Sequence, residues 1–261
     1  MDHEIVGHQI IGDGPCKVLV LHGWFGDHTI WEPAYRFIDQ RAFSFVFMDY
    51  RGYGASRGLV GRHSIAEMSA DAIALADHLD WPSFSVVGHS MGGQVAQRIA
   101  LDAVGRVLAV VGITPVPAMG VKMPPQAEAF FGAVADSDEV GCQVIDVSLG
   151  NRLKPNIARQ IMRFSRETSD VEAFRHYGEA FIKTDFGEEA KAITLPMLIL
   201  VGEHDGGVTE EVVRSTFPSL YPHVQIKILP NSGHYPMLET PAWLMTMIEA
   251  FLAGNVTRRA G

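Results

Sequence analysis

The stretch FSVVGHSMGG, residues 84–93, passes from an apolar run into a helix-like run with no loop between them. Apolar and β-branched residues before Gly88 are typical of a strand, and residues 94–100 have helical spacing. So abrupt a turn strains the backbone of Ser90, and glycines two positions before and after it make room. The Ser90 hydroxyl is therefore predicted at a helix N-terminus, where free N–H groups favour a developing negative charge. This position is typical of a nucleophile.

Length and composition are those of an ordinary globular protein. The chain has 261 residues, 47% hydrophobic and 20% charged, enough for one large α/β domain or two small ones. The formal net charge is −9 and no basic run is longer than Arg258-Arg259, so nucleic acid is not expected as a partner. Cys16 and Cys142 lie far apart without metal-ligand spacing, and we interpret them as free thiols.

The sequence gives no sign of a membrane segment. No apolar run approaches the roughly 20 residues that span a bilayer. Residues 1–4 lack the positive start and apolar core of a signal peptide. We therefore expect a cytoplasmic protein with no membrane partner, and the sequence leaves its oligomeric state open.

Strand-like and helix-like patterns alternate in two parts of the chain. The predicted strands are two short ones within 3–11, broken at Gly7, and runs at 17–21, 43–48, 84–89, 107–113, 196–201 and 224–229. The predicted helices that accompany them cover 29–40, 64–79, 91–102, 209–217 and 241–253. Between 117 and 194 we find no strand pattern, and helices are predicted near 125–136, 138–149, 155–167 and 170–184.

This alternation predicts an α/β protein with a mostly parallel sheet of the eight-stranded type, flanked by helices. The core comprises 1–116 and 195–261, and a helical cap, 117–194, is inserted after the sixth strand. Ligands of such sheets bind outside the carboxyl ends of the strands. The residues predicted to meet at that edge are His22, Asp49, Ser90, Asp205 and His234.

The residues at this edge supply the groups that acyl transfer by serine requires. Such chemistry uses a base beside the hydroxyl, an acid that orients the base, and donors for the oxyanion. Asp205 follows a strand on a glycine-rich loop, and His234 follows the next strand. Asp49 also stands at a strand end and is the alternative acid.

The chain resembles the α/β-hydrolase family from about residue 16 to 253. Five motifs carry the resemblance in the order and spacing of that family: His22-Gly23-Trp24, Asp49-x-Arg51-Gly52-x-Gly54-x-Ser56, Gly88-His89-Ser90-Met91-Gly92-Gly93, Gly202-x-x-Asp205, and Gly233-His234 followed by Glu239-Thr240-Pro241. The motifs are specific for fold and catalytic residues and much less specific for substrate.

The resemblance implies a role for each matched residue. Ser90 would be the nucleophile, His234 the general base and acid, and Asp205 its orienting carboxylate. The backbone N–H groups of Trp24 and Met91 would form the oxyanion hole. In this family the residue at His22 supports the oxyanion loop, and the motif at Asp49 stabilises loops. A serine at position 90 excludes the branches that attack with aspartate.

Several other residues have simpler interpretations. His204 beside Glu203 lacks a metal-binding spacing and is interpreted as a rim or surface residue, and His89 as a support of the turn. The aromatic and methionine side chains of the cap are mainly internal packing, with two or three facing the pocket. These side chains are Phe130, Phe131, Phe164, Phe174, Phe181, Met119, Met123 and Met162.

We therefore predict a serine hydrolase that cleaves a carboxylic ester or lactone with an apolar moiety through an acyl-enzyme on Ser90, with no cofactor and no metal. The expected partner is a small apolar ester or lactone. Two alternatives stay open. The same residues could cleave a carbon–carbon bond next to a ketone, or the fold could act as a ligand receptor. Specificity depends on cap side chains whose directions the sequence does not give.

Overall fold

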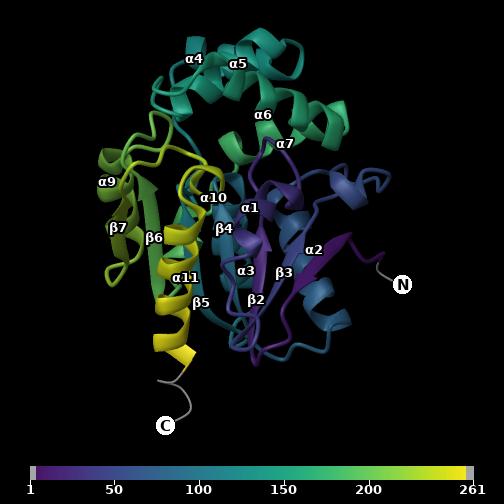
Figure 1. Cartoon of the computed structure of the whole chain (residues 1–261), viewed down its shortest axis with the longest axis vertical. Helices are drawn as coiled ribbons and strands as arrows, with labels where there is room; N and C mark the ends of the chain where they lie inside the picture. Colours follow the sequence, from purple (N-terminus) through teal and green to yellow (C-terminus); the bar gives the residue numbers. More distant parts are fainter. Residues whose placement is uncertain (1–3, 257–261) are drawn as a thin grey trace.

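The computed structural model describes residues 4–256 and contains a seven-stranded sheet. Its strands are β1 His8–Ile11, β2 Cys16–Leu21, β3 Phe43–Met48, β4 Phe84–His89, β5 Val107–Ile113, β6 Met197–Gly202 and β7 Gln225–Leu229. Their order is β1-β3-β2-β4-β5-β6-β7, and only β1 runs antiparallel to its neighbour. The predicted α/β class with a mostly parallel sheet is confirmed (Figure 1), with seven strands within residues 4–256 in place of eight.

The prediction of two strands within 3–11 is wrong for the first of them. Residues 4–7 form no strand, and His3 lies outside the described residues. The Gly7 N–H donates to Ser56 Oγ at 2.7 Å, and the Gly7 carbonyl accepts from the Asp49 N–H at 2.8 Å. Because the Gly7 N–H bonds to the side chain of Ser56, it is not available for a strand ladder. The helical insertion consequently follows the fifth strand, β5, and not the sixth.

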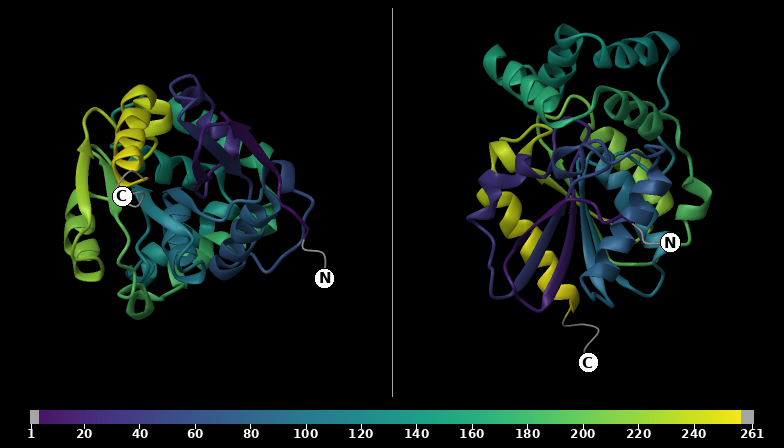
Figure 2. Two further views of the ribbon diagram at one scale, coloured as in Figure 1. Left: turned by 90° about the horizontal axis from the view of Figure 1, so that it is seen from below. Right: turned by 90° about the vertical axis from the view of Figure 1, so that its right-hand side faces the viewer.

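Helices cover both faces of the sheet, as Figure 2 shows in its edge-on view. The core helices are η1 His28–Trp31, α1 Glu32–Tyr35, η2 Gly54–Ser56, α2 Ile65–His78, α3 Met91–Asp102, α9 Glu210–Leu220, α10 Pro236–Glu239 and α11 Pro241–Val256. On one face α11 packs against α1 and β5, while on the other α3 packs against α2 and three central strands. The sheet is thereby buried on both sides, which accounts for the almost uninterrupted apolar runs of its central strands.

The predicted helix over 29–40 is shorter than expected. Helical structure ends at Tyr35, and the chain then turns into β3. The Asp39 carboxylate accepts hydrogen bonds from the N–H groups of Arg41 and Ala42, and the carbonyl of Asp39 accepts from Phe43. Such a side-chain-to-backbone turn competes with helix continuation.

The chain between β5 and β6 is helical. It contains α4 Pro125–Gly132, η3 Ala133–Ala135, α5 Asp138–Ser148, α6 Pro155–Thr168, α7 Val171–Lys183 and α8 Gly187–Ala190. All of residues 117–194 are described and none belongs to a named strand, as predicted. We call α4 to α7 the helical segment; it lies over the carboxyl ends of the strands (Figure 1). Along residues 4–256 no helix combines the length and apolar character that crossing a bilayer requires.

Candidate active site

Ser90 lies in the turn between β4 and α3 with a strained backbone. Its φ of 54° and ψ of −118° fall where non-glycine residues are rare. The peptide is held in place because the Ser90 N–H donates to the Ile113 carbonyl at 2.9 Å and the Ser90 carbonyl accepts from Gly93 and Val116. A side chain at Gly88 would collide with the backbone of Gly92. The turn predicted from the glycine spacing is therefore present.

The loop after β2 lies against this turn. A Cβ atom added at Gly23 would stand 3.2 Å from Ser90 Cβ and 2.7 Å from a ring nitrogen of His89. His22 Nδ1 donates to the Gly23 carbonyl at 2.7 Å. Because that carbonyl and the Trp24 N–H belong to one peptide plane, this bond points the N–H away from the His22 ring.

Trp24 is fixed by two further contacts. Tyr53 Oη donates to the Trp24 carbonyl at 3.0 Å, and Trp24 Nε1 donates to the Phe174 carbonyl of α7 at 2.7 Å. The Trp24 and Phe174 rings stack at a centroid distance of 4.4 Å. Met91 is the first residue of α3, so its N–H has no acceptor within the helix. Of the two predicted oxyanion donors, Trp24 thus lies on a braced loop next to Ser90 and Met91 lies at a helix N-terminus.

Asp205 and His234 are in direct contact. His234 Nδ1 donates to Asp205 Oδ2 at 2.6 Å. The other oxygen, Asp205 Oδ1, accepts from the N–H groups of Gly207 at 2.8 Å and Val208 at 2.9 Å. Both side chains are largely buried. A carboxylate held in this way fixes the proton of the imidazole on Nδ1 and leaves Nε2 as the basic nitrogen.

The backbone of His234 is held by hydrogen bonds that the sequence did not indicate. Its N–H donates to the Ser148 carbonyl, at the end of α5, at 3.0 Å. Its carbonyl accepts from His89 Nε2 at 2.7 Å. Burial and the neighbouring His234 ring lower the pKa of His89 well below its usual value, so His89 is neutral and acts as a fixed donor. Glu239 accepts from the N–H groups of Gly233 and Tyr235 on either side.

Ser90 and His234 both line a cavity of about 100 Å³. Its wall is mainly apolar and comes from both the core and the helical segment. The lining residues are Trp24, Phe25, His89, Val116, Val121, Met123, Phe131, Val144, Ser148, Phe181, Gly207, Val208 and Tyr235. Three of the eight aromatic and methionine side chains proposed from the sequence are among them, namely Met123, Phe131 and Phe181. That agrees with the prediction of two or three.

Comparison with known proteins identifies the family. A sequence profile described as "Alpha/beta hydrolase family" matches residues 18–246. The chain belongs to the alpha/beta hydrolase family.

Proteins similar to this α/β-hydrolase are named for different activities. A non-heme chloroperoxidase of Burkholderia pyrrocinia is 31% identical over 205 residues, covering 72% of this chain and 74% of the relative. A pimeloyl-[acyl-carrier protein] methyl ester esterase of Salmonella heidelberg is 28% identical over 245 residues, covering 90% and 93%. The structure of an enol-lactonase from Burkholderia xenovorans superposes with a TM-score of 0.81 at 20% identity, over 95% and 96% of the two chains. The predicted resemblance and the prediction of an esterase-like hydrolase are confirmed.

Asp49, the alternative acid of this α/β-hydrolase, is hydrogen-bonded to residues other than His234. Asp49 is buried and accepts from the N–H of His28 at 2.8 Å, from His28 Nδ1 and from the N–H of Ala55. Burial raises the pKa of Asp49, but the bonds from His28 outweigh it and lower the pKa overall. The burial of His28 lowers its pKa, and the bond to Asp49 outweighs this and raises it.

One group of potential metal ligands occurs among residues 4–256, formed by Asp27, His28 and Asp49. Its ligand atoms already have protein partners. Asp27 Oδ1 accepts from the N–H and the hydroxyl of Thr29, and Asp49 accepts the bonds from His28. Hydrogen bonding within the loops accounts for this group. His204 is exposed and contacts Glu203 at 3.6 Å, in keeping with its interpretation as a surface residue.

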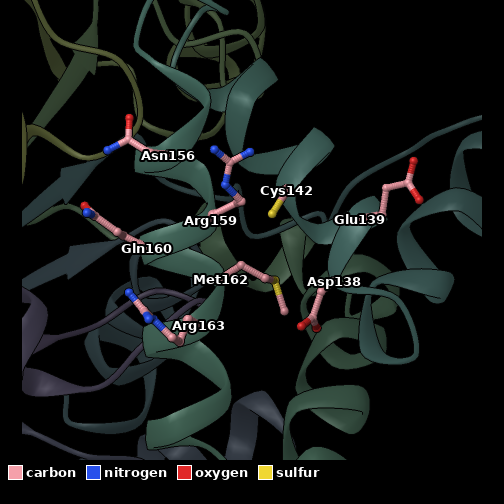
Figure 3. A pocket seen from close by; sticks show the side chains of 8 residues that line it. All are labelled: Asp138, Glu139, Cys142, Asn156, Arg159, Gln160, Met162 and Arg163. Atoms are coloured by element: carbon pink, nitrogen blue, oxygen red, sulfur yellow. The ribbon is translucent and has the colours of Figure 1, made fainter.

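A larger hollow, about 650 Å³, lies between α5 and α6. Figure 3 shows its lining, which is polar and charged and includes Asp138, Glu139, Arg159 and Arg163 around Cys142. None of the predicted catalytic residues lines it. Size alone therefore does not identify the candidate active site, since the strained Ser90 and His234 line the smaller cavity.

Proposed function

We propose that this α/β-hydrolase cleaves a carboxylic ester or lactone with an apolar part, with Ser90 as nucleophile, His234 as base and acid, and Asp205 as orienting carboxylate. One observation carries the proposal. The 2.6 Å contact between His234 Nδ1 and Asp205 Oδ2 leaves Nε2 of His234 basic in the same cavity as the strained Ser90.

The steps follow from these positions. His234 Nε2 takes the proton of the Ser90 hydroxyl while Ser90 Oγ attacks the carbonyl carbon. The carbonyl oxygen becomes an oxyanion, which the N–H groups of Trp24 and Met91 stabilise. His234 then gives its proton to the leaving alcohol, and the acyl group stays on Ser90. A water molecule repeats the attack, releases the acid and restores the serine.

In this proposal the stretch 117–194, which includes the helical segment, acts as a cap over the cavity. It contributes Val121, Met123, Phe131 and Phe181 to the apolar wall. An apolar wall with a few polar groups at the reacting atoms is typical of sites for small apolar ligands. The cap would exclude water from the oxyanion and select substrates by shape.

The test compares Ser90→Ala with a matched control in the same cavity. Ser148 also lines the cavity, but its hydroxyl donates to the Val144 carbonyl of its own helix at 2.9 Å. A fluorophosphonate probe should label the wild type and Ser148→Ala and leave Ser90→Ala unlabelled. Turnover of p-nitrophenyl acetate should fall by about 10⁴–10⁶ in Ser90→Ala alone. Equal labelling of Ser90→Ala would remove Ser90 from the mechanism, and preferred cleavage of a ring-cleavage diketone would favour carbon–carbon hydrolysis.

A further inference from the structure

The cavity at Ser90 is small for a complete substrate. Its volume is about 100 Å³, whereas a cavity that encloses benzene measures about 150 Å³. An acyl group of two to four carbons fits such a space, and an ester with two sizeable parts does not. One part of the substrate must therefore extend beyond the cavity.

A second hollow of about 540 Å³ lies close by, and we call it the α6 groove. Its size is within the range typical of small-molecule sites, roughly 300–1,000 Å³. The wall combines η1, α1, α6 and α10, so the groove runs between the core and the helical segment. Its main apolar residues are Leu149, Leu153, Ile157, Ile161, Phe164 and Leu238.

The α6 groove and the catalytic cavity adjoin one another. Tyr235 lines both of them. Leu149 of the groove directly follows Ser148 of the cavity. A side chain at Gly26, next to Phe25 of the cavity, would collide with the Phe164 ring of the groove. The two hollows thus share one wall residue and have neighbouring wall residues at two other places.

The direction of proton transfer decides which part of the substrate faces the groove. In the proposed reaction His234 protonates the oxygen of the leaving alcohol, so the alcohol must lie on the His234 side of the carbonyl carbon. Tyr235, the residue after His234, is the shared wall, and its ring packs against the His234 ring at a centroid distance of 5.4 Å. The alcohol part is therefore directed past Tyr235.

We propose that the α6 groove is the subsite for the alcohol part, and that the enzyme acts on esters of a short acid with an extended apolar alcohol. The inference rests on the proposed ester hydrolysis. It adds the orientation of the substrate, that is, which side of the ester carries the long chain. The Arg152–Glu239 ion pair and Asn231 form a polar rim on the groove. Together with Glu32, which also lines the groove, they can solvate a polar end of the alcohol.

An isomeric pair of esters tests this orientation of the substrate on the wild-type enzyme. Hexyl acetate and ethyl hexanoate have the same atoms and differ in the side of the ester that carries the long chain. We expect kcat/KM for hexyl acetate to be at least about tenfold higher, since each additional buried methylene contributes roughly fourfold. Preference for ethyl hexanoate, or equal rates, would overturn the subsite. If the enzyme hydrolyses neither of these esters and also fails to hydrolyse p-nitrophenyl acetate, the proposed function itself is ruled out.

A variant that fills the groove locates the effect. Ile157→Trp should lower kcat/KM for hexyl acetate at least about tenfold and leave ethyl acetate within about twofold. Val171→Trp is the matched control, because Val171 is exposed on α7 and lines neither hollow. It should change neither rate, and melting temperatures check that both variants fold. An equal loss on both esters, or no loss on hexyl acetate, would contradict the proposal.

Discussion

Replacing Asp205 by asparagine tests how this site fixes the proton on His234. The two oxygens of Asp205 have different partners. Oδ1 accepts from the N–H groups of Gly207 and Val208, and Oδ2 accepts from His234 Nδ1. An asparagine that keeps its oxygen on the two N–H groups must turn its NH₂ group toward His234. Nδ1 then has to be an acceptor, the ring proton moves to Nε2, and Nε2 can no longer take the proton of Ser90.

The alternative side-chain orientation is unfavourable. It would place the NH₂ group against two buried backbone N–H groups, each of which costs about 1–3 kcal/mol when unsatisfied. The wrong tautomer is thus preferred by about 2–6 kcal/mol. We expect kcat to fall by about 10²–10⁴, or about 3–5 kcal/mol at 1.36 kcal/mol for each factor of ten.

The assay is turnover of p-nitrophenyl acetate, with melting temperature as the folding control. Asp49→Asn is the comparison, because Asp49 is also a buried carboxylate at a strand end and its partners are His28 and Ala55. The variant Asp205→Asn should lose far more activity than Asp49→Asn at equal fold content. A folded Asp49→Asn enzyme with the greater loss would show that the acid has been assigned wrongly.

Two further predictions concern Phe131 in the helical segment and His63, which contacts His176 of that segment. Phe131 lines the cavity and Phe130 is 40% exposed without lining it, so Phe131→Ala should shift the preferred acyl length by at least one carbon and Phe130→Ala should not. Equal shifts in p-nitrophenyl ester profiles would contradict this. Burial and the neighbouring His176 lower the pKa of His63 in the folded protein. The unfolded chain therefore binds this proton more readily, and the stability of the folded protein falls as pH drops below about 6.5. The variant His63→Gln should therefore show a smaller fall in melting temperature between pH 7 and 5 than the wild type, with exposed His223→Gln as control; an unchanged slope would refute it.

The meeting of the residues proposed as catalytic could be predicted because topology brings them together. Ser90, Asp205 and His234 each follow a strand, and the carboxyl ends of parallel strands share an edge. Turn glycines and apolar runs can be recognised in the sequence. The sheet and the turn at Ser90 could therefore be predicted without knowledge of tertiary contacts. The error at residues 4–7 has the opposite origin. Val6 is apolar and buried, but the backbone of Gly7 bonds to the loop around Ser56, which no periodicity reveals.

The contacts that hold the site could not be predicted because their acceptors are backbone carbonyls. The Ser148 carbonyl accepts from the His234 N–H, and the Phe174 carbonyl accepts from Trp24 Nε1. Every residue type has a carbonyl, so these positions carry no motif. The side chains of Ser148 and Phe174 also gave no indication of these contacts, because the donors His234 and Trp24 lie 86 and 150 positions away in the chain.

These two hydrogen bonds connect the helical segment to residues that we propose as catalytic. One joins α5 to the backbone of the proposed base, and the other joins α7 to the loop that carries a proposed oxyanion donor. Both the direction of His234 Nε2 and the position of the Trp24 N–H therefore depend on where the segment rests on the core. A misplacement of about 1 Å at such groups can lower the rate by about 10²-fold. A change at the α5 or α7 contact should thus appear mainly in kcat, whereas a change in the lining residues should appear as a changed substrate preference.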